Sequence, residues 1–148
     1  MTNPKARKAR ENYLQGYNCA QAMMLAFAPD FGLGDEEALK VASPFGGGMG
    51  GQREVCGTVS CMCIICGHKY GYTRPKDAEA KAKLFARVQE LTNKFKKETG
   101  TILCRQLLGI EPLPCQTRED GTPYKKMQCA DIVHFAAKIM EDYLTENK

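Results

Sequence analysis

Apolar residues recur every three to four positions through most of the chain, which is the spacing of one face of an α-helix. Proline, asparagine, aspartate, threonine and glycine stand where this pattern starts and stops, as is common at helix ends. The predicted helices are residues 4–14, 19–27, 35–42, 54–70, 77–98, 101–108 and 127–145, with a glycine-rich loop (45–51) and an irregular connection (110–126) between them. The pattern therefore predicts an all-α fold, a compact helical bundle of about five to seven helices.

The predicted helices differ in the faces that they should bury. The segment 54–70 is apolar almost all round, which is typical of a central helix covered on most sides. The two long helices are amphipathic, and the apolar stripe of each should face the core. The stripes consist of Ala78, Ala82, Phe85, Val88, Leu91 and Phe95 in the first, and of Ile132, Phe135, Ala136, Ile139 and Tyr143 in the second. Apolar stripes of this kind are also compatible with a homodimer.

The chain has 148 residues, of which 43% are hydrophobic, enough for one core, so we expect a single domain over residues 1–148. The composition excludes a disordered or collagen-like chain. No apolar run approaches the ~20 residues of a membrane-spanning helix, and the N-terminus lacks the apolar stretch of a secretory signal. We therefore expect a cytoplasmic protein without membrane insertion.

The net charge of +4 comes from the first ten residues, which hold four basic side chains and no acid. The other 17 basic residues balance the 17 acidic ones. A nucleic-acid-binding protein concentrates positive charge on a folded face, so nucleic acid is not an expected partner. The basic segment 1–12 could contact an acidic partner, but short basic tails more often serve solubility alone.

Eight cysteines are the unusual feature of the composition. Stable disulfides are rare in a reducing compartment, so this number favours metal or cluster binding, catalytic redox chemistry, or small buried hydrophobic residues. The eight are Cys19, Cys56, Cys61, Cys63, Cys66, Cys104, Cys115 and Cys129.

The cysteines of the central helix resemble a metal-ligand run at first sight. Successive helical residues turn by about 100°, so Cys61 and Cys63 point to nearly opposite sides and do not share one ion. Cys63 and Cys66 lie one turn apart and could form a dithiol, but thiols in an apolar helix are more often packing residues. Cys63 also lies two turns from Cys56, on the same predicted face. Cys115, in the irregular connection, is a surface thiol or an accessory partner.

Four cysteines share one position, the first turn of a predicted helix: Cys19, Cys56, Cys104 and Cys129. A helix N-terminus offers unpaired N–H groups and a partial positive charge, which lower the pKa of a thiol from about 8.5 toward 7 or below. This placement favours reactive or metal-bound sulfur over packing.

The glycine-rich loop precedes one of these cysteines and lacks the lysine and hydroxyl residue of a phosphate-binding P-loop. Its flexibility would allow the backbone to pass close to Cys56 and donate N–H groups to sulfur, to a cluster or to a small anion. A plain connector is the alternative. The glycines expected to contribute are Gly46, Gly47, Gly48, Gly50 and Gly57. Neither His68 nor His134 makes a convincing catalytic pair with a cysteine.

Five spaced motifs occur in one order: Gly16-Tyr-Asn-Cys-Ala-Gln-Ala22, Phe45-Gly-Gly-Gly-Met-Gly50, Glu54-Val-Cys-Gly57, Cys104-Arg-Gln-Leu-Leu-Gly109, and Cys129 at the start of the last helix. From about Tyr13 to Leu144 the chain thus resembles the C_GCAxxG_C_C family of redox-active proteins. The resemblance implies a small bacterial or archaeal helical protein that performs redox chemistry. The family's four characteristic cysteines correspond to Cys19, Cys56, Cys104 and Cys129.

The chain departs from the family pattern at two positions. Where the pattern has Cys-Gly-Ala-x-x-Gly, the sequence reads Cys56-Gly-Thr-Val-Ser-Cys61, so Thr58 and Cys61 replace alanine and glycine. A larger residue at position 61 predicts looser helix packing there and a larger cysteine site.

The leading hypothesis is that the four characteristic cysteines meet at one end of the bundle and form a redox site. Four thiolates suit an iron–sulfur cluster in an electron carrier or sensor. They also suit two dithiol pairs of a thiol-dependent oxidoreductase, in which Cys56 would be the attacking thiol. A structural four-cysteine zinc site in a scaffold or interaction module is an alternative, although zinc ligands usually lie closer in sequence. Cysteines that only fill the core are a third reading. The redox partner is not specified by the sequence.

Overall fold

The computed structural model describes residues 2–148, and their regular structure is helical. The longer helices are α1 (Pro4–Leu14), α2 (Cys19–Phe27), α3 (Asp35–Ala42), α5 (Gly57–Tyr70), α6 (Ala78–Thr99) and α8 (Cys129–Glu146), and two short ones are α4 (Gly46–Met49) and α7 (Cys104–Leu107). Two 3-10 turns, Ala28–Phe31 and Ser43–Phe45, were not predicted. Residues 2–148 contain no strand, so the predicted all-α fold is confirmed.

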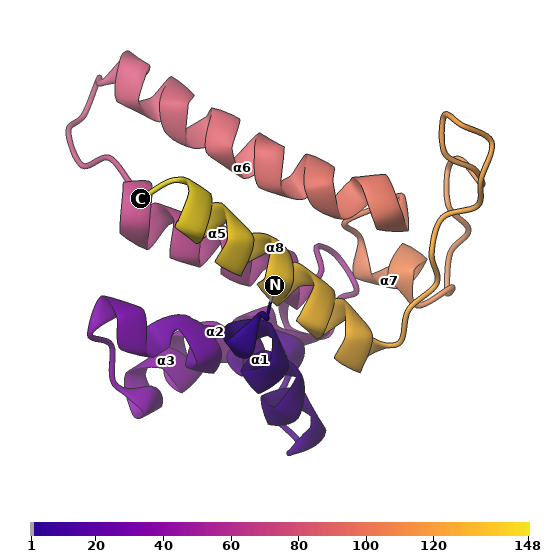
Figure 1. The fold of residues 1–148 in the computed structure, drawn as a ribbon, viewed down its shortest axis with the longest axis horizontal. Coiled ribbons are helices and arrows are strands. Elements are labelled where there is room, and N and C mark those ends of the chain that lie inside the picture. Colours follow the sequence, from indigo (N-terminus) through magenta and orange to yellow (C-terminus); the bar gives the residue numbers. More distant parts are fainter. Residues whose placement is uncertain (1) are drawn as a thin grey trace.

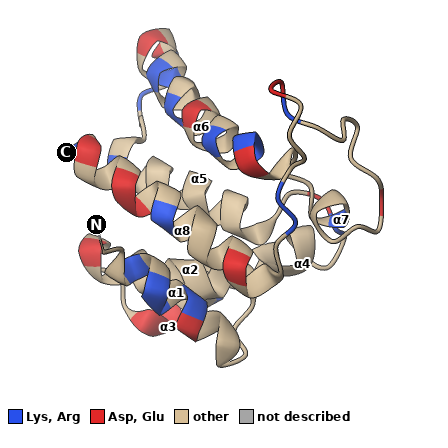
Figure 2. Ribbon diagram, turned by 45° about the vertical axis from the view of Figure 1, so that its right-hand side comes forward, with Lys and Arg blue, Asp and Glu red and all other residues tan. Residues whose placement is uncertain are grey.

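Helices α5 and α8 form the middle of the molecule, with α6 on one side and α1, α2 and α3 on the other (Figure 1). Helix α5 is almost free of charged residues, as expected of a central helix, whereas α1, α6 and α8 carry charges of both signs (Figure 2). Most of the largest fully buried side chains come from α2, α5, α6 and α8, among them Phe27, Met62, Phe95 and Met140. These four helices therefore share one hydrophobic core.

Helix α2 begins directly at Cys19 because Asn18 is a strong N-terminal cap. The Asn18 side chain accepts a hydrogen bond from the Gln21 backbone N–H at 2.8 Å, and the Gln21 side chain accepts one from the Asn18 N–H at 3.2 Å. The Asn18 amide also donates to the Ser43 carbonyl at 3.1 Å, which ties this cap to the segment before the glycine-rich loop. Cys19 is thereby fixed in the first turn, close to that loop.

The segment before α5 is extended, not helical, so the predicted start at residue 54 is wrong by three residues. Val55 pairs with Leu103 in an isolated antiparallel bridge. The Cys56 N–H donates to the Ile102 carbonyl at 2.8 Å, and the Cys104 N–H donates to the Glu54 carbonyl at 2.6 Å. This pairing of distant segments outweighs the local helical pattern and brings Cys56 beside Cys104.

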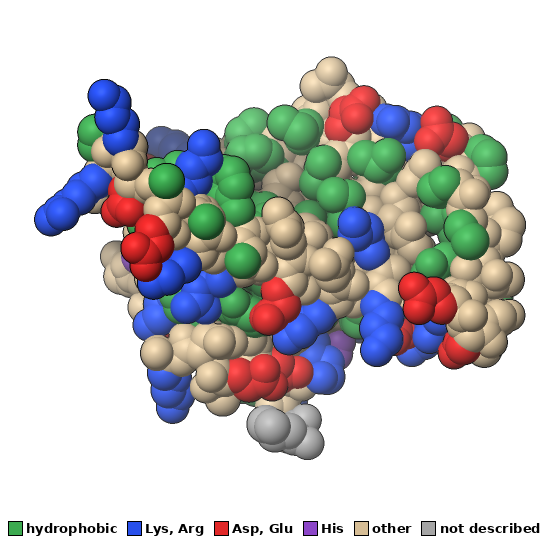
Figure 3. Space-filling view, turned by 90° about the horizontal axis from the view of Figure 1, so that it is seen from above, with side chains coloured by type: hydrophobic (Ala, Val, Ile, Leu, Met, Phe, Trp, Pro, Cys, Tyr) green, Lys and Arg blue, Asp and Glu red, His purple; other side chains and the backbone are tan. Residues whose placement is uncertain are grey.

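The apolar stripe of α6 is buried only in its second half. Leu91 and Phe95 are buried, but Ala78 and Ala82 are exposed and Phe85 is 49% exposed, so the prediction that these three face the core is wrong. Hydrophobic side chains lie between charged ones on this side of the molecule (Figure 3). No helix within residues 2–148 is long and apolar enough to cross a membrane.

Candidate functional site

One cavity of about 380 Å³ is lined by all four cysteines that begin predicted helices. Cys19 and Cys129 open α2 and α8, Cys104 opens α7, and Cys56 is the residue directly before α5. The structure thus brings together four sulfurs that lie far apart in the sequence. This space is called the cysteine cavity below.

Cys19 is surrounded by backbone. The N–H groups of Gly47 and Ala20 donate hydrogen bonds to its sulfur, and they lower its pKa. Burial has the larger, opposite effect, so the pKa of Cys19 is raised overall. Gly57 passes so close that a Cβ atom there would lie 2.5 Å from the Cys19 Sγ. The glycines at 47 and 57 therefore allow the backbone to contact the sulfur of Cys19, whereas the sequence analysis expected the loop to contact Cys56.

Cys56 is the most enclosed of the four and only 6% exposed. Burial raises the pKa of Cys56 to about 12, against the weaker opposing effect of hydrogen bonds from Thr58 and Val59. Its Sγ lies 3.1 Å from the Thr58 hydroxyl, so the threonine that departs from the family pattern contacts the sulfur directly. The predicted low pKa of Cys56 is wrong, because desolvation outweighs the helix N-terminus.

Cys104 and Cys129 have polar side-chain partners. The Arg53 guanidinium donates to the Cys104 Sγ at 3.7 Å, and this contact, first among several, raises the pKa of Arg53. The Tyr13 hydroxyl hydrogen-bonds to the Cys129 thiol, and the pKa of Tyr13 is raised, first by burial and then by the nearby Cys129 and Cys19. Cys104 is 9% exposed, whereas Cys129 and Cys19 are half-buried, so the cavity reaches solvent beside the latter two.

Each of the four sulfurs therefore has its own hydrogen-bond donor: Gly47 N–H for Cys19, Thr58 N–H for Cys56, Arg53 for Cys104 and Tyr13 for Cys129. Among the described residues that line the cavity there is one cation, Arg53, and no carboxylate. Donors aimed at sulfur and a positive charge nearby favour thiolate over thiol. The surroundings thus suit bound, negatively charged sulfur, although burial opposes free thiolates here.

The predicted glycines divide into two groups. Gly47 and Gly57 line the cavity, whereas Gly46, Gly48 and Gly50 do not. Gly48 supports the site from behind, because it is left-handed (φ +67°) and a Cβ there would lie 2.7 Å from the Cys104 Cβ. Gly46 leaves room for the Asn18 side chain, because a Cβ at position 46 would lie 2.5 Å from the Asn18 Cγ. Gly50 turns the loop, and its N–H donates to the Pro44 carbonyl.

The remaining cysteines lie outside the cavity. Cys61 is buried against α2, with its Sγ 3.9 Å from the Met24 sulfur, so residue 61 packs against α2 and does not enlarge the site. Cys66 is also buried in the core. Cys63 is exposed and does not share the side of Cys56, because Cys56 precedes the helix with an extended ψ of 133°. Cys115 is an exposed surface thiol.

Neither histidine lines the cysteine cavity. The His68 ring lies against Phe31 with centroids 4.4 Å apart, at the far end of α5. His134 lies within α8, beyond its first turn. Both histidines therefore lie away from the four cysteines that line this cavity.

Sequence reasoning missed Tyr13 as part of the site and gave Thr58 and Arg53 no role toward sulfur. Tyr13 belongs to α1, which packs against both α2 and α8, and the phenol reaches Cys129 only because of that packing. Arg53 has a left-handed backbone (φ +61°), an uncommon conformation for a residue with a side chain. No periodicity or spacing in the sequence predicts either contact.

The raised thiol pKa of Cys56 gives a pH dependence that can be measured on metal-free protein. Because Cys56 keeps its proton to about pH 12 when folded, and an unfolded cysteine loses it near pH 8.5, the unfolded state is favoured as the pH rises between these values. We expect Cys56 to contribute a fall in unfolding free energy of roughly 1.6 kcal/mol from pH 8.5 to pH 10 in urea titrations. C56A should remove that contribution and keep the rest of the slope, because burial also raises the thiol pKa of Cys61 and Cys19. Equal slopes in both proteins would contradict the effect of burial on Cys56.

The fold and the cavity define a small helical protein with a polar cluster of four cysteines. Within residues 2–148, no three histidine, cysteine or acidic side chains are arranged to hold a single metal ion. No curated protein and no solved structure matched the sequence. A family pattern matches residues 17–143, so the chain belongs to the family described as "Putative redox-active protein (C_GCAxxG_C_C)".

Proposed function

We propose that this protein carries electrons by means of an iron–sulfur cluster bound in the cysteine cavity. Cys19, Cys56, Cys104 and Cys129 would be its ligands, the number that the common two-iron and four-iron clusters take. The observation that supports this most is that each of these sulfurs has a separate hydrogen-bond donor around one shared cavity. Membership of a redox-active family agrees with it.

A single zinc ion fits this arrangement less well. Structural zinc needs four ligands in a tetrahedron with bonds of about 2.3 Å to sulfur, so the sulfurs must converge on one point. No such group is present within residues 2–148. A cluster distributes its thiolate bonds over two or more irons, so its ligands can surround a wider space.

A dithiol oxidoreductase is also less well supported. Its attacking thiol must ionise near neutral pH and reach the substrate. Cys56, expected from the sequence to be that thiol, has a pKa of about 12 and is 6% exposed. Coordination to iron would instead offset the cost of burying its charge.

The surrounding residues would each act on one ligand. Arg53 at Cys104 supplies positive charge, while Gly47, Thr58 and Tyr13 supply hydrogen bonds to the other three sulfurs. Such contacts stabilise the more negative, reduced state and so raise the reduction potential. The bound cluster supplies the chemistry itself, the uptake and release of one electron at a time.

Absorption and electron paramagnetic resonance spectra of protein purified without oxygen test this proposal. We expect visible absorption that bleaches when dithionite is added, together with a new paramagnetic signal, and both should return on mild oxidation. A colourless protein whose only response to oxidation is the loss of titratable thiols would contradict the cluster and support the dithiol form.

A further inference from the structure

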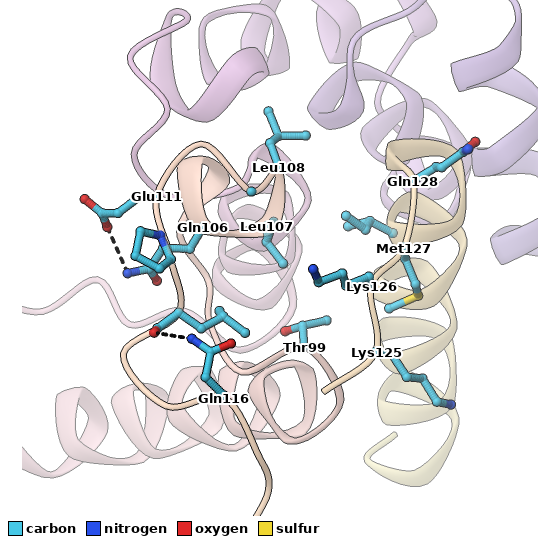
Figure 4. A pocket seen from close by; sticks show the side chains of 14 residues that line it. Thr99, Gln106, Leu107, Leu108, Glu111, Gln116, Lys125, Lys126, Met127 and Gln128 are labelled. Atoms are coloured by element: carbon cyan, nitrogen blue, oxygen red, sulfur yellow. Dashed lines mark hydrogen bonds between the residues drawn. The ribbon is translucent and has the colours of Figure 1, made fainter. Parts of the chain in front are cut away.

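A second cavity, of about 480 Å³, lies next to the cysteine cavity. Leu107, Leu108 and Ile132 line both, so the side chains of α7 and of the first turn of α8 form the wall between them. The rest of the second cavity is formed by the end of α6 and by residues of the irregular connection that lie on two sides of it (Figure 4). Its size is within the range of pockets that bind small molecules.

Most charged groups around the second cavity already have partners. The Lys125 Nζ lies 3.2 Å from the Glu98 carboxylate, and the Glu111 carboxylate lies 3.3 Å from the Arg105 Nε. The Thr99 hydroxyl lies 2.9 Å from the carbonyl oxygens of both Phe95 and Thr101, and its single hydrogen is donated to one of them.

Lys126 is different. Within the described part of the chain it forms no ion pair, and its side chain points into the cavity toward Leu107, whereas Lys125 points away (Figure 4). Leu107, Leu113 and Met127 contribute apolar surface to the lining, beside the polar side chains of Gln106, Gln116 and Gln128. The cavity thus combines one free cation with apolar surface.

We propose that the second cavity binds a small organic anion, a carboxylate or sulfonate with an apolar body. Lys126 would pair with the anionic group, and the leucine and methionine side chains would contact the body. A bound molecule would touch Leu107 and Ile132, the wall shared with the cysteine cavity. The bound molecule would then lie beside the redox site. Its binding does not depend on the function proposed above, but its use as a redox substrate rests on that function.

Fluorescence titration with 8-anilinonaphthalene-1-sulfonate, an aromatic sulfonate, tests the binding. We expect one molecule to bind per chain, about fivefold more weakly to K126Q, and more weakly still to L113D, which places a negative charge in the wall. Added salt should weaken binding to the original protein more than to K126Q. The neutral dye N-phenyl-1-naphthylamine should not distinguish the original protein from K126Q.

Two matched variants serve as controls. K96Q removes a lysine from the last turn of α6 that does not line the cavity, and F85D removes the exposed aromatic ring of the same helix. Both should bind the sulfonate as the original protein does. Unchanged binding in K126Q and L113D, or loss of binding in F85D alone, would overturn the proposal. Because metal-free protein can be titrated, this result is independent of whether a cluster is present.

Discussion

Replacing Cys104 by serine lowers the iron content of protein purified without oxygen at least about tenfold, if Cys104 is a cluster ligand. Serine is nearly the same size, so the core should be unaffected, but its hydroxyl is a poor substitute for a soft thiolate. Loss of a residue that only supports a ligand already weakens metal binding by about 10 to 100-fold. Metal analysis of C104S, normalised to protein, measures the effect.

Cysteines outside the cavity provide the matched control for this substitution. C63S and C115S each remove one exposed thiol that does not line the cysteine cavity, and both should retain the original iron content. Circular dichroism of all three variants should show the same helicity. Iron retained in C104S, or lost to the same extent in C63S, would mean that the four cavity cysteines are not the ligands.

The second large effect is expected at Gly57, the first residue of α5. A Cβ at this position would lie 2.5 Å from the Cys19 Sγ and 2.8 Å from the Phe45 carbonyl oxygen. Neither neighbour can move freely, because Cys19 lies in the first turn of α2 and the Phe45 oxygen is part of the backbone. G57A should therefore displace the Cys19 sulfur, destabilise the fold by about 1–3 kcal/mol and lower the iron content as well.

Gly67 offers the control within the same helix. It lies in α5, and a methyl group at this position would have nothing within 4 Å, so G67A should be neutral or stabilise the protein by up to about 1 kcal/mol. Urea unfolding of both variants, followed by circular dichroism, measures the difference. Equal stability of G57A and G67A would contradict the close contact between Gly57 and Cys19.

Much of the fold could be predicted because the local pattern and the tertiary structure agree. Pro4, Asn18 and Gly100 stand at the ends of helices where capping rules place them, and the observed bounds of α1, α2 and α3 match the prediction. The start of α5 was wrong because the extended segment that ends at Cys56 pairs with residues 102–105, far away in the sequence. Local propensity does not contain such a pairing.

The candidate site divides in the same way. The position of four cysteines near helix starts could be recognised from the sequence, and the structure brings these four to one cavity. Their protonation could not be predicted, because the pKa of Cys56 depends on how deeply the fold buries it. The contact between Tyr13 and Cys129 was likewise hidden, since it follows from the packing of α1 against α8.

The ratio of iron to acid-labile sulfide per chain, in protein purified without oxygen, tests the central claim most directly. An iron–sulfur cluster in the cysteine cavity requires iron and sulfide in equal amounts, with at least two of each per chain when the cavity is fully loaded. One zinc per chain without sulfide would contradict the claim in favour of a structural metal site. A chain free of iron and sulfide after reconstitution with both would leave the four cysteines without a cluster and contradict the proposed function.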